Sequence, residues 1–169
     1  MATPKLFIFA GLPASGKTTL AQQLASDSNA VYLRTDSIEQ ALRDFYDLQV
    51  EGEGYRLAYR IAADNLRLGL SVVADSCNPI ELTRLELEGV AEAECAVFIN
   101  VEVVCSDPVE HRRRVENRAS SVPNLSLPTW SDIIAREYHE WTVPPVRIDT
   151  SGCSPEASYE QLRLLLNRI

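Results

Sequence analysis

The chain has 169 residues, 46% of them hydrophobic and 24% charged, which is the composition of one globular domain with a packed core. Its net charge of −8 makes extended nucleic acid an unfavourable partner, because the protein repels a polyanion. No apolar run approaches the roughly 20 residues that cross a bilayer, and the apolar run at residues 5–10 is too short for a signal peptide, so we expect a cytoplasmic protein without membrane contacts.

The spacing of apolar residues predicts strands and helices that alternate along the chain. Short apolar runs are the predicted strands, at residues 5–10, 30–34, 71–75, 97–105 and 146–149. Segments with apolar residues three and four apart are the predicted helices, at residues 17–26, 38–45, 55–69, 78–93, 107–118, 130–141 and from 154 onward.

Strands separated by helices are typical of a parallel sheet, because each crossover must return the chain to the same edge. Helices then cover both faces of the sheet. We therefore predict a doubly wound α/β fold with a five-stranded parallel sheet in the order 2-3-1-4-5, in one domain over residues 1–169. Ligands of such sheets bind at the carboxyl ends of the strands.

The most specific motif joins the first strand to the first helix. It reads Gly11-Leu12-Pro13-Ala14-Ser15-Gly16-Lys17-Thr18 and matches G-x-x-x-x-G-K-[ST], the phosphate-binding loop (P-loop) of P-loop NTPases. The two glycines let successive N–H groups face one concavity, and the helix N-terminus adds partial positive charge. A glycine-rich turn with a solvated Lys17 is the alternative.

This motif predicts a site for ATP with Mg²⁺. Lys17 can supply an ammonium group to the outer phosphates, and Thr18 can supply a hydroxyl to the metal ion. Thr19, the next residue of the helix, completes the expected nucleotide-binding set of residues 11–19.

Two aspartates stand where predicted strands end. Asp36 follows the second strand, and its carboxylate could accept a proton from a hydroxyl that attacks the γ-phosphate. Asp36 with Glu39 three residues later is equally a helix-capping arrangement, and both roles are open. Asp75 ends the third strand, where an acid can bind Mg²⁺ together with Thr18; a turn after the strand is the alternative. Nearby Asn78 either faces the substrate or forms an Asx turn.

Residues at about 107–128 have the features of a lid over a phosphate site. The helix start Asp107-Pro108-Val109-Glu110 combines an N-cap acid, a proline at the first position and a glutamate three residues after the cap. Two prolines among polar residues then predict a loop at 119–128.

The helix of this region carries several arginines. His111, Arg114 and Arg118 share one face, and lid arginines can stabilise the charge that develops on a transferred phosphoryl group. We expect Arg114 and Arg118 to make these contacts, with Arg112 or Arg113 as alternatives. The other interpretation is a solvated basic face that pairs with nearby glutamates.

Taken together, these residues resemble one family. The P-loop, Asp36 after the second strand, Asp75-Ser76-Cys77-Asn78-Pro79 after the third and the arginine-rich helix after Cys105 are similar to small P-loop kinases. This family is related to chloramphenicol phosphotransferase, zeta-toxin-type kinases and the kinase domain of phage polynucleotide kinase. Its members are often labelled predicted kinases or AAA-family ATPases.

The resemblance implies an ATP-dependent phosphotransferase that moves the γ-phosphate to a hydroxyl of a small molecule. Lys17 and Thr18 would handle phosphate and Mg²⁺, Asp36 would be the base, and Arg114 or Arg118 would contact phosphate from the lid.

The acceptor site departs from the nucleic-acid kinases of the family. Members similar to polynucleotide kinase place an arginine three residues after the catalytic aspartate, whereas this chain has Glu39 there, with Arg43 one turn later. Together with the acidic net charge, this disfavours a nucleic-acid acceptor. The acceptor pocket is expected around Tyr55, Tyr59, Arg84 and residues 119–130.

Other functions fit the same P-loop. An adenylyl-sulfate kinase or a polynucleotide kinase would keep the chemistry, and a regulatory nucleotide-binding ATPase would act through a protein partner. A GTPase switch would need N-K-x-D, which does not occur, and a D-x-x-G after the third strand, whereas the nearby D-x-x-G at Asp149–Gly152 follows the fifth strand.

Overall fold

The computed structural model describes residues 3–168. Its strands form one parallel sheet in the order β2-β3-β1-β4-β5, which confirms the predicted order. The strands are β1 (Lys5–Ala10), β2 (Val31–Arg34), β3 (Val72–Asp75), β4 (Val97–Val104) and β5 (Val146–Asp149). Because β1 pairs with β3 on one side and β4 on the other, the P-loop that follows it lies at the middle of the sheet edge.

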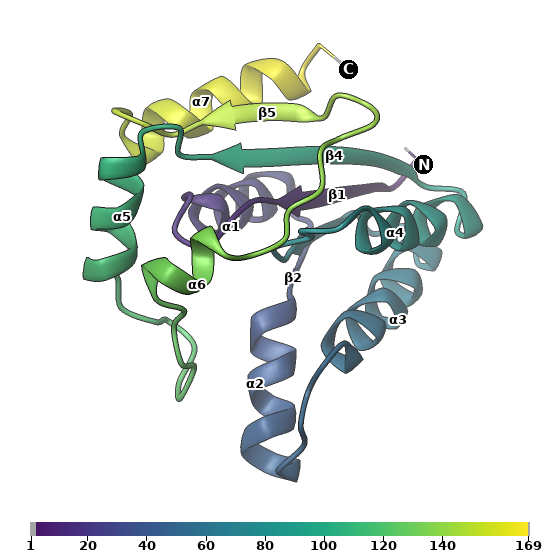
Figure 1. Ribbon diagram of the computed structural model, residues 1–169. Helices are drawn as coiled ribbons and strands as arrows, with labels where there is room; N and C mark the ends of the chain where they lie inside the picture. The colour runs from purple at the N-terminus through teal and green to yellow at the C-terminus, as the bar shows by residue number, and fades with distance from the viewer. Residues whose placement is uncertain (1–2, 169) are drawn as a thin grey trace.

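Helices cover both faces of this sheet (Figure 1). They are α1 (Lys17–Ser28), α2 (Thr35–Tyr46), α3 (Glu53–Arg67), α4 (Glu81–Ala93), α5 (Pro108–Asn117), α6 (Trp130–Ile134) and α7 (Pro155–Leu166). None of the described helices is long and apolar enough to cross a membrane.

Side chains of β1 alternate between two buried clusters, because successive residues of a strand face opposite sides. Phe7 and Phe9 pack against α1 and α7, where Leu162 is fully buried. Leu6 and Ile8 pack on the other face, against α3 and α4. The strand that leads into the P-loop is therefore held from both sides.

α2 and α5 frame the carboxyl ends of the strands. α2 extends away from the sheet beside α3, and α5 with the short α6 lies across from it (Figure 1). α5 begins as predicted: Asp107 accepts hydrogen bonds from the backbone N–H groups of Val109 and Glu110. The carboxylate of Glu110, however, binds Gly152 N and the Arg114 side chain, so it does not close a capping box.

The predicted helix at 130–141 is wrong beyond its first turns. α6 ends at Ile134, and the following segment is irregular. Tyr138 and Trp141 donate from their side chains to the buried carboxylate of Glu102 on β4. The backbone N–H of His139 donates to the Pro79 carbonyl. These long-range contacts override the helical spacing of the sequence.

A pair of glycine variants tests the packing at the P-loop. Gly11 has φ of +143°, and a Cβ there would lie 2.2 Å from the carbonyl oxygen of Val103. Gly11→Ala should therefore lower the free energy of unfolding by about 2–3 kcal/mol. Gly89, exposed on α4 with open space around it, is the control. Gly89→Ala should stabilise the protein by about 1 kcal/mol in urea unfolding, and equal effects of the two variants would contradict the packing described.

Candidate active site

A cavity of about 980 Å³ opens at the carboxyl ends of the strands. Its size is at the upper end of typical ligand pockets, which leaves room for a nucleotide and a second small molecule. We call the part lined by α2, its N-cap residue Arg34 and Tyr55 the α2 end; its polar lining includes Arg34, Asp36, Glu39, Gln40 and Arg43. The opposite part, the β5 end, is lined by Thr19, Arg114, Thr150, Cys153 and Pro155.

Hydrogen bonds from distant segments hold the P-loop in shape. Gly16, at the N-cap of α1, has φ of 95°, a conformation that favours glycine. The backbone N–H of Gly11 donates to the Cys77 carbonyl at 3.0 Å. The hydroxyl of Thr150, just after β5, donates to the Ser15 carbonyl at 2.7 Å. The loop is therefore fixed by segments that follow β3 and β5.

The P-loop lysine forms a buried ion pair. Lys17 Nζ lies 3.3 Å from Asp75 Oδ1, and both side chains are buried. Burial alone would lower the pKa of Lys17, but Asp75, Cys77 and Asp36 together raise that pKa above its usual value. Burial alone would raise the pKa of Asp75, but Lys17 and the Tyr32 hydroxyl, which donates to Asp75 Oδ2 at 2.7 Å, lower it. Both partners are therefore charged.

The oxygens beside this pair suit Mg²⁺. Asp75 Oδ1 is buried and accepts no hydrogen bond, and the Thr18 hydroxyl also interacts with this carboxylate. Mg²⁺ binds through one or two protein oxygens together with phosphate oxygens and water. Within residues 3–168 no cluster of three metal-ligating side chains occurs, so Thr18 and Asp75 would hold the ion only alongside a bound phosphate.

Asp36 lies in the first turn of α2 with its carboxylate in the cavity. The helix begins at Thr35, two residues earlier than an N-cap role of Asp36 requires, and Arg34 occupies the N-cap position. Asp36 is therefore not the N-cap residue. Its side chain is 46% exposed and lies 3.9 Å from Arg34 Nη2, so the carboxylate is open to a ligand.

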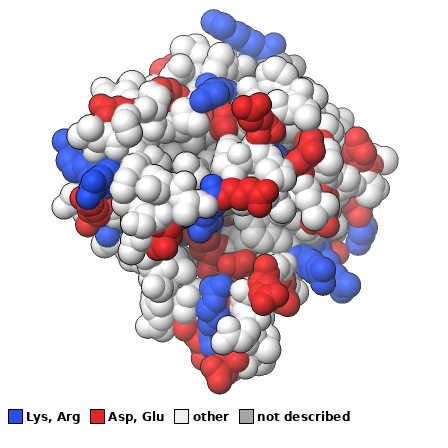
Figure 2. Space-filling model, viewed as in Figure 1, with Lys and Arg blue, Asp and Glu red and all other residues white. Residues whose placement is uncertain are grey.

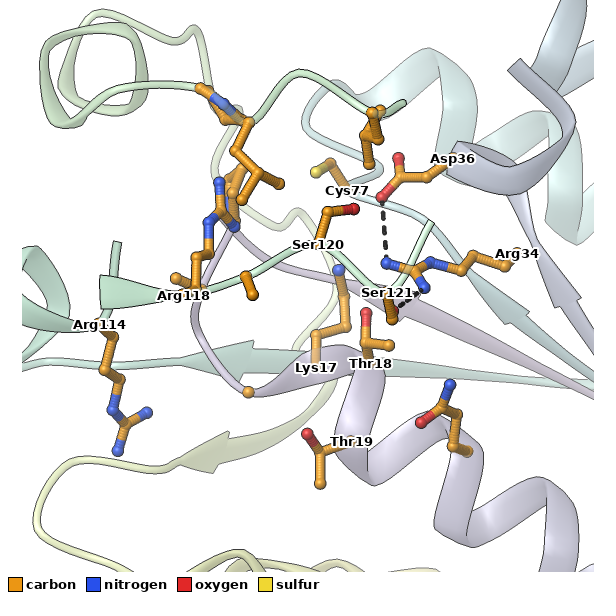
Figure 3. Close-up of a pocket in the computed structure, with 18 of the residues that line it drawn as sticks. Lys17, Thr18, Thr19, Arg34, Asp36, Cys77, Arg114, Arg118, Ser120 and Ser121 are labelled. Carbon is orange, nitrogen blue, oxygen red and sulfur yellow. Dashed lines mark hydrogen bonds and ion pairs between the residues drawn. The ribbon is translucent and has the colours of Figure 1, made fainter. Parts of the chain in front are cut away.

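The two expected lid arginines lie differently. Arg114 donates to the Thr150 hydroxyl at 2.7 Å, to the Thr150 carbonyl at 2.8 Å and to Glu110 at 2.6 Å, which fixes its guanidinium at the β5 end. Arg118 lines the same cavity, but its Nε and Nη2 are buried without a hydrogen-bond partner in the described structure. Burial lowers the pKa of Arg118. Figure 3 shows the side chains of Arg114 and Arg118 extending in opposite directions, and Arg118 interacts electrostatically with Cys77 and Asp36.

Arg112 and Arg113 lie outside the cavity. Both are exposed, and Arg112 pairs with Glu116 on the outer side of α5. The alternative of a solvated basic face is therefore correct for Arg112 and Arg113. Arg114 and Arg118, by contrast, line the cavity.

His111 connects α5 to the P-loop. Its ring is buried and donates from Nε2 to the Pro13 carbonyl at 2.8 Å. The edge of the same ring meets Trp130 of α6 at a centroid distance of 5.3 Å. Since α5 is the helix of the predicted lid and α6 follows the lid loop, these contacts set the position of the lid relative to the phosphate site.

Two residues expected in the acceptor pocket belong elsewhere. Tyr55 and most of residues 119–128 line the cavity, but Tyr59, Arg84 and residues 129–130 are not among the lining residues. The guanidinium carbon of Arg84 lies 4.0 Å from the centroid of the Trp141 ring. The same guanidinium is buried and donates hydrogen bonds to four backbone carbonyls. It fixes the segment after α6 instead of binding a ligand.

Asn78 also has a structural role. It is fully buried, and its side-chain amide donates to the Phe9 carbonyl at 2.8 Å. The bond ties the end of β1 to the segment after β3, so this amide nitrogen does not face a substrate.

Three cavity residues were missed from the sequence. Arg34 donates to Ser121 Oγ at 2.8 Å, Arg136 lines the cavity from the segment after α6, and Thr150 joins Arg114 to the P-loop. Only Thr150 had a usable signal, since it begins a polar run at the carboxyl end of the fifth strand.

The cavity is basic although the protein is acidic. Acidic side chains are spread over the face shown in Figure 2, with basic ones scattered among them and no continuous basic stripe. Among the lining residues, however, only Asp36 and Glu39 are acidic. The basic lining residues are Lys17, Arg34, Arg43, Arg114, Arg118 and Arg136. This distribution favours a compact anion over an extended one.

Removing the charge of Asp75 tests the buried pair. Asp75→Asn would leave Lys17 buried without a counter-ion, so the free energy of unfolding should fall by about 3 kcal/mol near pH 7. Glu160→Gln, which breaks an exposed ion pair with Arg163, is the control and should change the free energy of unfolding by less than about 0.5 kcal/mol.

The pH dependence of this difference follows from the lowered pKa of Asp75. The pair stabilises the fold above the unfolded-state pKa of about 3.9 and loses this effect as the carboxylate becomes protonated in the folded state. In urea unfolding, the gap between wild type and Asp75→Asn should stay constant from about pH 8 to 5 and narrow below about pH 4. A gap that widens in acid would contradict this account.

Comparison with known proteins agrees with this geometry. A family model described as an AAA domain matches residues 6–136. A search of curated proteins found no match. The fold resembles that of the APS kinase of Mycobacterium tuberculosis in complex with AMPPNP and APS, at 19% identity over 99% of both chains with a TM-score of 0.72.

Two further structures show the same architecture. A gluconokinase from Sinorhizobium meliloti 1021 matches at 14% identity over 99% of this chain and 97% of the other, with a TM-score of 0.69. Kti12 from Chaetomium thermophilum, in complex with ADP-AlF3, matches at 23% identity over 96% and 97%, also with a TM-score of 0.69. At these identities the likeness shows the fold. With its P-loop and the family match over most of its length, the chain belongs to the AAA-domain family of P-loop NTPases and has the fold of the small P-loop kinases.

Proposed function

We propose that the protein is an ATP-dependent kinase that moves the γ-phosphate of ATP to a hydroxyl of a small molecule in the cytoplasm. The observation that carries this proposal is the arrangement in Figure 3. The open carboxylate of Asp36 faces the same part of the cavity as Lys17 and Arg118. A base, a phosphate-binding lysine and an unpaired arginine around one space are the groups that phosphoryl transfer requires.

The transfer can be written with these residues. The substrate hydroxyl oxygen attacks the γ-phosphorus, the bond from phosphorus to the bridging oxygen of ADP breaks, and Asp36 accepts the hydroxyl proton. Lys17 and the N–H groups of the P-loop hold the phosphates. When bound through Thr18 and Asp75, Mg²⁺ would neutralise part of the phosphate charge.

The lid arginines have separate roles in this proposal. Arg118, with two buried nitrogens that lack a partner, contacts the transferred phosphoryl group. Arg136 lies close enough to influence the pKa of Arg118 and supplies a second positive charge there. Arg114, fixed to Thr150, lines the β5 end, where the base and sugar of ATP extend from the P-loop. Residues 107–128 then act as the lid of a kinase unit formed by the whole chain.

A regulatory ATPase is the second candidate. The P-loop and the family match fit it as well as they fit a kinase, because both concern the nucleotide site alone. Turnover of ATP that no hydroxyl compound increases, but that a protein partner changes, would favour this alternative over the kinase.

Lys17→Ala tests nucleotide binding. Without the ammonium, the outer phosphates lose their main side-chain partner, so ATP should no longer raise the melting temperature. Wild-type protein measured under the same conditions should show a clear rise in differential scanning fluorimetry. An unchanged rise in the variant would contradict the role of Lys17.

Asp36→Asn tests the base. The variant should bind ATP nearly as the wild type does, because the ion pair that Asp36 forms in the described structure is with Arg34 and not with the P-loop, whereas kcat should fall by about 10²–10⁴-fold. The readout is phosphate-ester formation beside calorimetric ATP affinity. Full transfer activity would show that Asp36 is not the base.

Arg118→Ala tests the lid. Because the charge on the phosphoryl group develops in the transition state, kcat should fall by about 10²-fold or more while ATP affinity changes by less than about threefold. Arg113→Ala, on the exposed side of the same helix, is the matched control and should change neither value. Equal losses of affinity and turnover in Arg118→Ala would contradict the assignment.

A further inference from the structure

The charges at the α2 end of the cavity are paired with one another. Arg34 Nη2 lies 3.9 Å from Asp36 Oδ2, and Arg43 Nη2 lies 3.5 Å from Glu39 Oε2. Each of these two pairs of lining residues therefore combines one acid with one arginine and carries no net charge.

The pair of Glu39 and Arg43 is built into the packing. A Cβ on Gly54 of α3 would lie 2.1 Å from Glu39 Cγ, so the glutamate side chain fits only because residue 54 is glycine. Burial raises the pKa of Glu39, and the charge and hydrogen bond of Arg43 oppose that rise. Glu39 is thus held where it offsets the charge of Arg43.

The rest of the wall mixes apolar and polar groups. The Tyr55 ring lines the cavity beside α2, and the loop opposite contributes Leu125, Leu127 and Pro128 together with the polar side chains of Ser121 and Asn124.

The positive charges without an acidic partner lie on the side of Asp36 that faces Lys17. Arg118 and Arg136 have no ion pair in the described structure, and both affect the electrostatics at Cys77 or Asp36, beside Lys17. This is where the transferred phosphoryl group would lie in the proposed function. MgATP keeps net negative charge, and these two arginines offset it.

From this distribution we infer that the acceptor is an uncharged hydroxyl compound of the sugar or polyol type. This inference rests on the proposed kinase function. An anionic acceptor would meet Asp36 and Glu39, and a cationic one would meet Arg34 and Arg43, so either would bring a buried charge that no free partner compensates. Paired polar groups beside an aromatic ring and apolar side chains suit a molecule with hydroxyls on one side and CH groups on the other.

Three pools of hydroxyl compounds of similar size test the charge preference. One pool holds neutral sugars and polyols, one holds hydroxy acids and sulfated or phosphorylated alcohols, and one holds amino alcohols and amino sugars. Wild-type protein with MgATP should form phosphate esters, detected by mass spectrometry, at least about tenfold faster in the neutral pool. A rate in either charged pool equal to or above the neutral one would overturn the inference but keep the kinase function. No ester in any pool, with ATP binding intact, would overturn both.

Glu39→Gln then tests the residue that sets this preference. The variant leaves Arg43 unpaired, so KM for the neutral acceptor should rise about tenfold with kcat within about threefold. The carboxylate analogue of that acceptor should become a better substrate by a similar factor. Glu116→Gln removes the same charge from the outer side of α5 and is the control. If thermal melting shows a folded Glu39→Gln whose preference between the two acceptors is unchanged, the inference fails.

Discussion

The buried pair of Lys17 and Asp75 is the interaction on which the site depends. Two opposite charges are removed from water at 3.3 Å, and either one alone would be costly there. Because Lys17 belongs to the P-loop and Asp75 to the end of β3, the pair can form only when β1 and β3 are neighbours in register, with Phe9 opposite Asp75. The order of the strands therefore determines whether the buried charges of the phosphate site can pair.

The two ends of the cavity are built in different ways. At the β5 end, Thr150 joins Arg114 to the Ser15 carbonyl, and His111 joins α5 to the Pro13 carbonyl, so the lid helix is fastened directly to the P-loop. At the α2 end, the walls come from a helix that extends away from the sheet and from the 119–128 loop. In the proposed kinase, the P-loop and the β5 end serve the nucleotide, whereas α2 and the loop meet the acceptor.

Most of the fold could be predicted because its signals are local. Apolar runs between helical segments are sufficient to indicate a parallel sheet, and the P-loop indicates which strand is central. The wrong prediction of a helix over residues 130–141 arose because the deciding contacts are long-range. Tyr138 and Trp141 have helical spacing, but the buried carboxylate of Glu102, far away in the sequence, draws both side chains away from a helix. A pattern read along the chain contains no such partner.

The sequence by itself determined the P-loop and the placement of Asp36, Asp75 and the lid arginines after particular strands, because each depends on neighbouring residues. The sheet order could be predicted because strands that alternate with helices are joined by right-handed crossovers. Only the tertiary structure decided which of these side chains meet. In it, Arg114 binds Thr150 whereas Arg118 has two buried nitrogens without a partner, and Arg136 lines the cavity whereas Arg84 packs against Trp141. It also paired the charges of α2, since ion pairs and burial depend on distances in space that residue spacing does not specify.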